Sequence, residues 1–471
     1  MKVTMNMNWM EEVKKREKAL LQDLQTFLRI PSVRNEQTAT EEAPLGKEVY
    51  EALYYMLKRG KEEGFVVKNV DGLAGHIEMG HGEEMVGILC HVDVVPAGDG
   101  WTFDPFGATI VDGKIYARGA LDDKGPTIAA FYAMKIVKEL GLPLSKRVRM
   151  IIGTDEESDW QCVERYFQTE PMPTLGFAPD ADFPIIYAEK GIADFDLTQH
   201  PINKQTADCV LLSFQAGRRY NMVPDFAEAV LQSTNGNDMK ERFIAFLHVH
   251  TLEGEAHVDG ETMTLRLRGV SAHGMEPNNG VNAGLWLAKF LADETLDPQA
   301  NEFVRFVSQY FYGDTRGKQL GVAHTNEELG DLTINVGVLS YTSEHGGKVG
   351  INLRYPVTSD IAHTKEVVER VANRHHFALT NFSNSSPHYV AKDHPLVQTL
   401  QRVYEEQTGE RASLLAIGGG TYARSLQAGV AFGPLFPNRP DVAHQKDEHM
   451  FIDDLLKATA IYAQAIYELA K

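Results

Sequence analysis

The residues with the clearest chemical potential are histidine and acidic residues that follow short apolar runs. The run from Ile88 to Cys90 leads into His91, and Asp93 stands two residues further on. If the run is a buried strand, the side chains at these two positions point to the same face at its end. A His-x-Asp pair is common by chance, so it gains meaning only from similar clusters elsewhere in the chain.

Four further places carry such side chains, and most of them follow predicted strands. These places are Asp122 before a predicted helix, Glu156 and Glu157 in an Asp-Glu-Glu run, Asp180 after Ala178-Pro179, and His444. Each has a simpler explanation when taken alone. His91 resembles a structural histidine, Asp122 a helix cap, the acidic run a solvated loop, and Asp180 a turn residue. None of these explanations accounts for the position of the clusters after apolar runs. Because open α/β sheets bind ligands at the carboxyl ends of their strands, we expect the clusters to converge.

A convergent site would hold two imidazoles and at least four carboxylates, which repel one another unless cations are present. Two divalent cations resolve the conflict. Asp122, Glu157 and Asp180 supply three negative charges against four positive ones, and a bridging hydroxide cancels the remaining charge. Paired cations lower the pKa of bound water and polarise a carbonyl, and Glu156 is free to move the proton to a leaving amine. The mixed nitrogen and oxygen ligands suit Zn²⁺ or Mn²⁺, with Co²⁺ as a further possibility.

The elements that must position these residues change in character along the chain. From about residue 84 to 195, apolar runs alternate with helical stretches, which is typical of a mostly parallel α/β sheet with helices on both faces. The expected strands are Met85–Cys90, Val148–Ile152 and Leu175–Ala178, and the expected helices include Trp9–Ile30 and Gly125–Leu140.

The middle of the chain follows a different pattern, with alternating strands such as Thr262–Arg268 beside helices such as Asn282–Ala292 and Thr364–His376. This pattern favours an α+β domain with one solvated sheet face. The last part returns to the first style, with helix Leu396–Gln407, strand Val430–Phe432 and helix Asp453–Leu469. We therefore predict a catalytic domain of residues 1–195 and 386–471, interrupted by an inserted domain of residues 196–385.

Composition narrows the partners of this 471-residue chain, of which 43% is hydrophobic and 24% charged. A formal charge of −19 argues against nucleic acid, which is bound through clustered cations. No apolar run approaches eighteen residues, and the N-terminal region lacks the apolar stretch of a signal peptide, so we expect no membrane partner. Three widely spaced cysteines, Cys90, Cys162 and Cys209, suit a reducing compartment, and the cytoplasm is the expected location.

At these residues the chain resembles the dinuclear metallopeptidase family of aminoacylases, carnosinases and bacterial dipeptidases, from near residue 40 almost to the C-terminus. It is most similar to PepV-type dipeptidases, through residues 98–101, 352–356 and 416–422. The resemblance implies that His91, Asp122 and Asp180 bind one metal ion, and that Asp122, Glu157 and His444 bind the other. It also implies that Asp93 orients His91 and that Glu156 is the general base. Asp123, where many relatives have methionine, competes with Asp122 for the bridging role, although Asp122 is favoured.

The inserted domain resembles the lid of this family. His273, in Ser271-Ala272-His273-Gly274, matches a lid histidine that stabilises the oxyanion, and Asn221 matches a residue that helps to hold that region. The resemblance implies that the terminal carboxylate of the substrate binds to Arg354, and to backbone N–H groups of a glycine turn formed by Gly418, Gly419 and Gly420.

Together these features predict a metal-dependent dipeptidase that holds a small peptide in a cleft between its domains. The nearest alternative is an N-acyl- or N-succinyl-amino-acid amidohydrolase with the same metal chemistry. A catalytically inactive binding or storage protein is the alternative from another class, and Glu156 argues against it because a binder needs no base. In PepV-type relatives the long insertion replaces the lid of a neighbouring subunit, so we expect a monomer.

Overall fold

The structure is a computed structural model, and it describes residues 7–202 and 207–471. The chain divides into two compact units. The first comprises the chain up to Ala188 together with Tyr389–Leu415 and Thr421–Lys471, and the second comprises Glu189–His388 and Ala416–Gly420. Strand β10 (Gly191–Gln199) lies in the second unit, whereas the limit expected between residues 195 and 196 falls inside it.

The first unit is built around a sheet whose strand order, in the described residues, is β1-β2-β6-β3-β7-β22-β9-β20, with β21 also paired to β9. The central strands β6, β3, β7 and β22 are parallel, while β1 and β2 extend one side in antiparallel fashion. All seven residues of β3 are buried, as expected for an apolar run in the middle of a parallel sheet. The bounds are β1 Val66–Val70, β2 Ala74–Met79, β3 Met85–His91, β6 Arg147–Gly153, β7 Leu175–Ala178, β9 Ile185–Glu189, β20 His388–Tyr389, β21 Leu414–Ile417 and β22 Gly429–Ala431.

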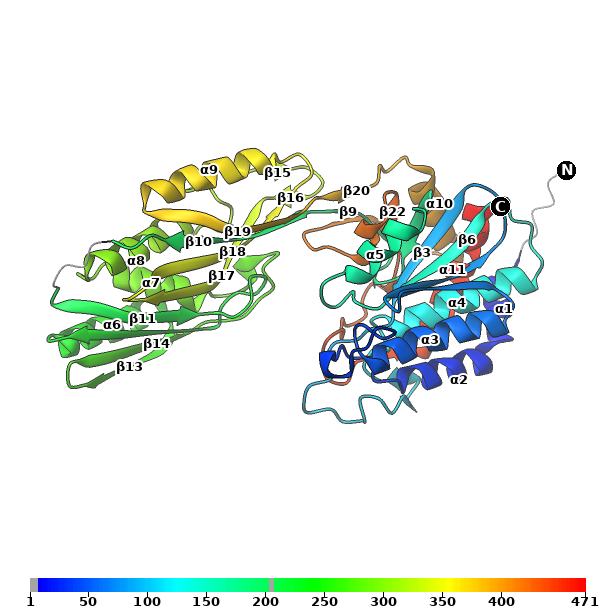
Figure 1. Ribbon diagram of the computed structural model, residues 1–471, viewed down its shortest axis with the longest axis horizontal. Coiled ribbons are helices and arrows are strands. Elements are labelled where there is room, and N and C mark those ends of the chain that lie inside the picture. Colours follow the sequence, from blue (N-terminus) through cyan, green and yellow to red (C-terminus); the bar gives the residue numbers. More distant parts are fainter. Residues whose placement is uncertain (1–6, 203–206) are drawn as a thin grey trace. The chain divides into compact units, whose positions relative to one another are not determined.

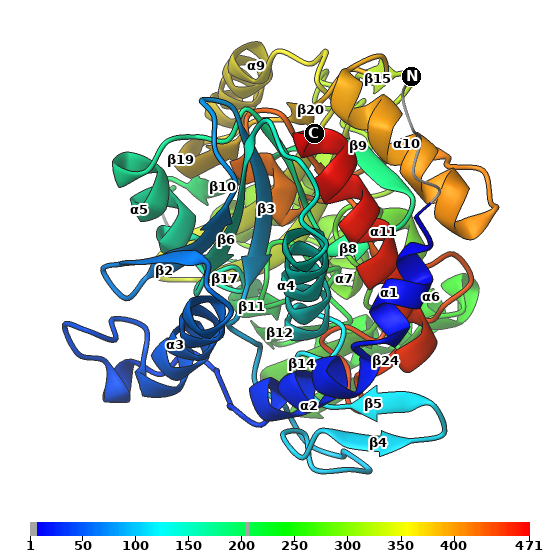
Figure 2. The same ribbon diagram turned by 90° about the vertical axis from the view of Figure 1, so that its right-hand side faces the viewer.

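Helices cover both faces of this sheet. Figure 2 shows α4 and α11 on one side of β3 and β6, with α3 and α5 toward the other side. Helix α4 is buried along most of its length because its sequence is rich in alanine and large aliphatic residues. Asp453 and Asp454 lie in the first turn of α11, where their negative charges interact favourably with the positive end of the helix dipole. The bounds are α3 Lys47–Glu62, α4 Lys124–Glu139, α5 Gln161–Thr169, α10 Pro395–Thr408 and α11 Ile452–Ala470.

The N-terminal region differs from the prediction of one helix over Trp9–Ile30. It forms two helices, α1 (Trp9–Lys14) and α2 (Glu17–Leu28). The backbone N–H of Arg16 bonds to the carbonyl of Val13 at 2.8 Å, which tightens the chain into a turn. The Arg16 guanidinium also bonds to Glu12 and to Glu139 of α4, so the break places a cation between two carboxylates. Amphipathic spacing continues across such a break and does not reveal it.

The second unit is an antiparallel sheet of order β13-β14-β12-β11-β17-β18-β10-β19 within the described residues. In β14, buried Met263, Leu265 and Leu267 alternate with more exposed neighbours, so one face is buried and the other faces solvent. Helices α6 to α9 contribute to a single apolar core with the buried face (Figure 1). The bounds are β11 Cys209–Ala216, β12 Phe226–Ser233, β13 Glu253–Asp259, β14 Thr262–Arg268, β17 Thr333–Thr342, β18 Gly346–Tyr355, β19 Phe377–Ser385, α6 Gly236–His250, α7 Ala283–Ala292, α8 Pro298–Phe311 and α9 Ile361–Arg374.

The expected fold class is confirmed. An α/β unit with parallel central strands and helices on both faces is interrupted by an α+β unit. A small sheet of β24 (His449–Phe451), β5 (Lys114–Tyr116) and β4 (Thr109–Val111) ties the C-terminal segment to the chain before α4. Among the helices of the described residues, none is both long and apolar enough to cross a lipid bilayer.

Candidate functional site

The chemically promising residues of the first unit lie beyond the ends of neighbouring parallel strands. His91 is the last residue of β3, Glu156 and Glu157 follow β6, and Asp180 follows β7. Asp122 comes just before α4, and His444 lies between β23 (Pro434–Leu435) and β24. The carboxyl ends of parallel strands share one edge of the sheet, which is why residues so distant in sequence meet here.

Asp122 stands at the centre of the group and contacts both imidazoles. Its Oδ1 lies 3.0 Å from Nε2 of His91, and its Oδ2 lies 3.0 Å from Nε2 of His444. Glu157 Oε1 is 2.9 Å from Nε2 of His444, and Asp180 Oδ2 is 3.7 Å from Nε2 of His91. One carboxylate therefore joins two half-sites, each with one imidazole and one further carboxylate.

Asp93 connects His91 with the acidic run after β6. Its carboxylate oxygens accept the backbone N–H groups of Glu156 at 3.2 Å and Glu157 at 3.0 Å. Nδ1 of His91 lies 3.0 Å from the backbone carbonyl of Asp93 and 3.4 Å from its Oδ1. These contacts leave Nε2 of His91 directed to Asp122 and Asp180, and they fix the start of the segment that carries both glutamates.

The protonation of the group shows how strongly its charges interact. Burial opposes ionisation of Asp122, but hydrogen bonds with His444 and His91 hold its pKa below the usual range. Burial, followed by the charge of Asp122, raises the pKa of Glu157 to about 7 and that of Asp180 to about 6. Burial and the charge of Asp180 raise the pKa of Glu156 well above its ordinary value. Hydrogen bonds to Asp122 and Glu157 raise the pKa of His444 to about 11.

These shifts describe a site whose excess negative charge is balanced by protons on imidazoles and carboxyl groups. Divalent cations would balance the same charge, because the donors are imidazole nitrogens and carboxylate oxygens. Two overlapping groups of donors, each within 4.8 Å of one another, occur in the described residues: His91, Asp122 and Glu157, and His91, Glu156 and Asp180. The donor set fits a pair of divalent cations.

A model of the peptidase family M20/M25/M40 matches residues 87–468, which include both imidazoles and all of these carboxylates. The chain belongs to this peptidase family. It is therefore an enzyme, a peptidase, and its resemblance to the family of aminoacylases, carnosinases and bacterial dipeptidases is confirmed.

Two relatives match this M20 peptidase over nearly their whole length. The Bacillus subtilis protein named "Putative dipeptidase YtjP" is 57% identical over 466 residues, covering 99% of this chain and 100% of that protein. A Staphylococcus epidermidis protein with the same general designation is 48% identical over 464 residues, covering 98% of this chain and 99% of its own length.

Solved structures share the fold at low sequence identity. Aminoacylhistidine dipeptidase from Vibrio alginolyticus has a TM-score of 0.59 and 15% identity, covering 96% of this chain and 97% of its own. Aminopeptidase PepT from Bacillus cereus has a TM-score of 0.57 and 16% identity, covering 97% and 99%. At these identities the likeness shows the fold of the M20 peptidase and nothing further.

The second unit gathers the residues expected to bind substrate. Arg354 is buried on β18, where its Nε donates to Asn352 at 2.8 Å and its Nη1 donates to the carbonyl of Gly418 at 3.2 Å. The loop that carries His273 pairs with the chain at Met222, and Gly274 donates its N–H to the carbonyl of Asn221 at 2.7 Å.

The glycine turn of the second unit, which comprises Gly418, Gly419 and Gly420, lies close to the loop of His273. A Cβ added at Gly418 would stand 3.5 Å from Cβ of Met275, and one at Gly419 would lie 3.9 Å from its sulfur. His273 itself is exposed, and its Nδ1 accepts the N–H of Met275 at 3.1 Å. The unit therefore brings the predicted anion-binding residues and the predicted oxyanion residue onto adjoining segments.

The two adjacent aspartates before α4 make different contacts. Asp122 does not cap α4, because the cap position belongs to Asp123 and its side chain makes no capping bond. Asp123 accepts the backbone N–H of His91 at 3.1 Å and the hydroxyl of Thr127 at 3.2 Å, whereas Asp122 contacts both imidazoles.

Sequence reasoning missed two residues that surround this site. Tyr422 is fully buried and its ring meets the His91 imidazole edge to face, with centroids 5.9 Å apart. Glu448 is fully buried and bonds to the loop that carries Asp122. Tyr422 lies in the motif of residues 416–422, of which only the glycines were assigned a role, and Glu448 lies among charged residues that sequence alone does not mark as buried. No local pattern distinguished either one.

Proposed function

We propose that this M20 peptidase is a metal-dependent dipeptidase, which hydrolyses short peptides with a free C-terminal carboxylate. The observation that carries the proposal is the position of the Asp122 carboxylate between two imidazoles. Its Oδ1 lies 3.0 Å from Nε2 of His91, and its Oδ2 lies 3.0 Å from Nε2 of His444. Its relatives' designation as dipeptidases supports the same conclusion. His91, Asp122 and Asp180 would hold one cation, and Asp122, Glu157 and His444 the other, with Zn²⁺, Mn²⁺ or Co²⁺ as suitable ions.

The proposed mechanism divides the work among the chain's own residues. When bound, a pair of divalent cations would lower the pKa of water toward neutrality and polarise the peptide carbonyl. Glu156 accepts the proton of the attacking water and delivers it to the departing amine. Asp93 keeps both His91 and the Glu156 backbone in place through the bonds described above.

Substrate recognition falls to the second unit in this proposal. The Arg354 guanidinium and the glycine turn hold the terminal carboxylate of the peptide, since a planar guanidinium pairs with carboxylate through two parallel bonds. His273 donates a hydrogen bond to the developing oxyanion, and Asn221 supports the loop on which His273 lies. Because the anchor binds the terminal carboxylate, a longer extension on the C-terminal side of the scissile bond does not fit, and this favours short peptides.

Hydrolysis assays with one metal at a time test the proposal. Chelation should abolish turnover of a neutral dipeptide, and Zn²⁺, Mn²⁺ or Co²⁺ should restore it, whereas a tetrapeptide should remain a poor substrate. Faster turnover of N-acetyl or N-succinyl amino acids would assign the protein to the amidohydrolases. Absence of any hydrolysis with all three ions would overturn the proposed activity.

Two further properties belong to this proposal. Cys90, Cys162 and Cys209 are unpaired and buried, which supports a reducing compartment such as the cytoplasm. We also propose that the protein works as a monomer, because the inserted segment, residues 196–385, has the length of the PepV-type insertion that replaces the lid of a neighbouring subunit. Light scattering should then report the mass of one chain at micromolar concentration, and the mass of two chains would contradict this.

A further inference from the structure

A buried carboxylate outside the proposed ligand set holds the loop that carries Asp122. Glu448 is fully buried, and its two side-chain oxygens accept four hydrogen bonds. Oε1 accepts the backbone N–H groups of Leu121 at 2.9 Å and Asp122 at 3.1 Å. Oε2 accepts the N–H of Gly119 at 3.1 Å and Nη1 of Arg118 at 2.7 Å.

The four donors are close neighbours in sequence, so the Arg118–Asp122 segment folds around the carboxylate of Glu448. A carboxylate suits this place because each oxygen faces two donors, and only an acceptor group matches all four. Arg118 is itself buried, and its charge is balanced by Glu448. Removal of the carboxylate would leave a buried cation and three backbone donors without their acceptor, which is costly.

The position of Glu448 is fixed from its own side as well. Ala117 donates its N–H to the carbonyl of Glu448 at 3.1 Å, and His449 pairs with Tyr116 in the small sheet of β24 and β5. His444, four residues before Glu448, reaches the second oxygen of Asp122. One short C-terminal segment therefore supplies an imidazole to Asp122 and a carboxylate to the backbone of the same residue.

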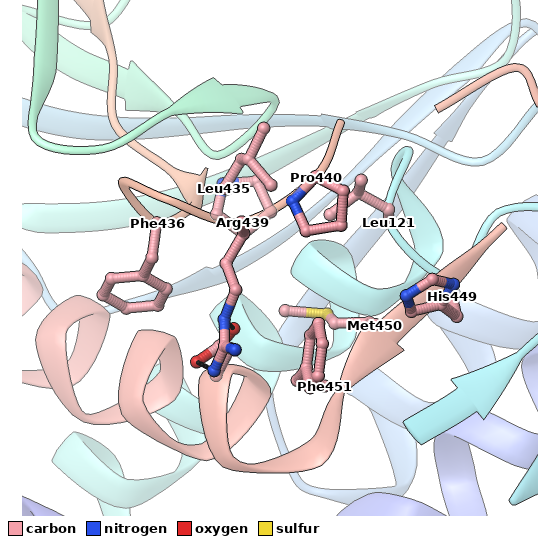
Figure 3. Close-up of a pocket in the computed structure, with 10 residues that line it drawn as sticks. Leu121, Leu435, Phe436, Arg439, Pro440, His449, Met450 and Phe451 are labelled. Carbon is pink, nitrogen blue, oxygen red and sulfur yellow. Dashed lines mark hydrogen bonds and ion pairs between the residues drawn. The ribbon is translucent and has the colours of Figure 1, made fainter. Parts of the chain in front are cut away.

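The Asp122 loop and β24 also lie next to each other. Leu121 from the loop and His449 and Met450 from β24 line a small pocket (Figure 3). The hydrogen bonds of Glu448 therefore act where the loop already lies next to β24.

We propose that Glu448 is a positioning residue, which orients the Asp122 carboxylate so that its two oxygens address His91 and His444 at the same time. The inference rests on the proposed dinuclear metal site and deepens it. Glu448 makes no hydrogen bond to either imidazole. It acts through the backbone of Asp122, and so keeps the two half-sites at the correct distance from each other.

Binding of Mn²⁺ alone to the metal-free full-length protein tests this role. Glu448→Gln keeps the shape of the side chain but replaces one acceptor oxygen by an NH₂ group, which cannot accept the N–H donors that face it. We expect it to weaken binding of the second Mn²⁺ by about 10- to 100-fold, as for other partners of ligand residues. Electron paramagnetic resonance should show loss of the exchange-coupled signal of the Mn²⁺ pair, which a merely structural role would leave intact.

Asp447→Asn is the matched control. Asp447 precedes Glu448, but its carboxylate is bonded to the N–H and hydroxyl of Thr102 at 2.7 and 3.0 Å and not to the backbone of the Asp122 loop. This variant should bind both ions as the wild type does. If Glu448→Gln fails to fold, Glu448→Asp replaces it, because the shorter carboxylate keeps the charge beside Arg118 and loses reach to the loop.

The outcomes separate this inference from the proposed function. A wild type that binds two Mn²⁺ ions, with Glu448→Gln or Glu448→Asp binding them equally and giving the same coupled spectrum, overturns the positioning role alone, even if the melting temperature falls. A wild type that binds no Mn²⁺ overturns the proposed metal site and this inference with it.

Discussion

At the scale of single residues, the two adjacent aspartates before α4 have different surroundings. Asp122 contacts both imidazoles, whereas Asp123 accepts bonds from the His91 backbone and Thr127. Asp122→Asn should therefore weaken binding of a second Mn²⁺ by more than the roughly 100-fold seen for outer partners of metal ligands. Asp123→Asn keeps one oxygen acceptor for both of its bonds, and should weaken binding by less than about 10-fold. Calorimetric titration distinguishes them, and the reverse order would make Asp123 the bridging residue.

Glu156 allows a separate test of catalysis at the residue scale. Its backbone is held by Asp93, and its side chain lies among the proposed ligands without being needed to join the two half-sites. Glu156→Gln should lower kcat for a dipeptide by about 10²- to 10⁴-fold, the usual contribution of a general base. The stoichiometry of Mn²⁺ should stay at that of the wild type. If kcat is retained, another group moves the proton.

The residues of the site were predictable from sequence to the extent that their positions followed from strand ends. His91, Glu157 and Asp180 each come after an apolar run, and parallel strands bring such ends to one edge. Glu448 was not predictable, because a fully buried carboxylate and a solvated one look alike in sequence. Its burial depends on the pairing of β24 with β5, which involves segments more than 300 residues apart.

At the scale of elements, strands β2 and β6 and helix α5 share a buried network of hydrogen bonds. Arg149 Nη1 donates to the hydroxyl of Tyr166 at 3.2 Å, and that hydroxyl lies 2.8 Å from Nδ1 of buried His76. The guanidinium is only a donor, so the hydroxyl oxygen accepts from it, and the positive charge of the guanidinium close to the imidazole favours the neutral form of His76. Burial and then the charge of Arg149 lower the pKa of His76 from 6.5 to about 4.

This network should make stability depend on pH. The unfolded chain takes up the His76 proton near pH 6.5 and the folded chain only near pH 4, so stability is complete above pH 6.5 and is lost as pH falls toward 4. The loss is at most about 3 to 4 kcal/mol, since one pKa unit corresponds to about 1.4 kcal/mol. Urea unfolding of the chelated protein at both pH values should show that His76→Asn removes this part of the slope. His81→Asn, at an exposed histidine, is the control; equal slopes in all three proteins would contradict the assignment.

Element boundaries show where prediction from sequence ends. β7 and β14 have the predicted bounds, Leu175–Ala178 and Thr262–Arg268, because apolar runs and alternation mark strands directly. The prediction of a single N-terminal helix was wrong, because the chain turns at Arg16, whose guanidinium bonds to Glu139 of the distant helix α4. A tertiary ion pair of that kind leaves no periodic trace in the local sequence.

At the scale of the whole molecule, the proposed metal ligands all belong to the first unit, although His91 and His444 are separated by the entire second unit in sequence. Metal binding should therefore stabilise the first unit selectively. A cation at 100 times its dissociation constant adds about 2.7 kcal/mol to the stability of the form that binds it. The second unit has its own core, formed by the buried face of its sheet and α6 to α9, and none of the proposed ligands lies in it.

Hydrogen exchange followed by mass spectrometry, with Mn²⁺ and after chelation, measures the stabilisation of each segment separately and so compares the two units. We expect Mn²⁺ to slow exchange most in the peptides around β3, the Asp122 loop and the segment from His444 to Glu448, since these share one set of contacts. Peptides from α7 and β14 should exchange at the same rate with and without the ion. Asp122→Asn should remove the protection from the first group. Equal protection in both units would mean that the cations stabilise the molecule as one cooperative body, and that the division into two compact units does not extend to its energetics.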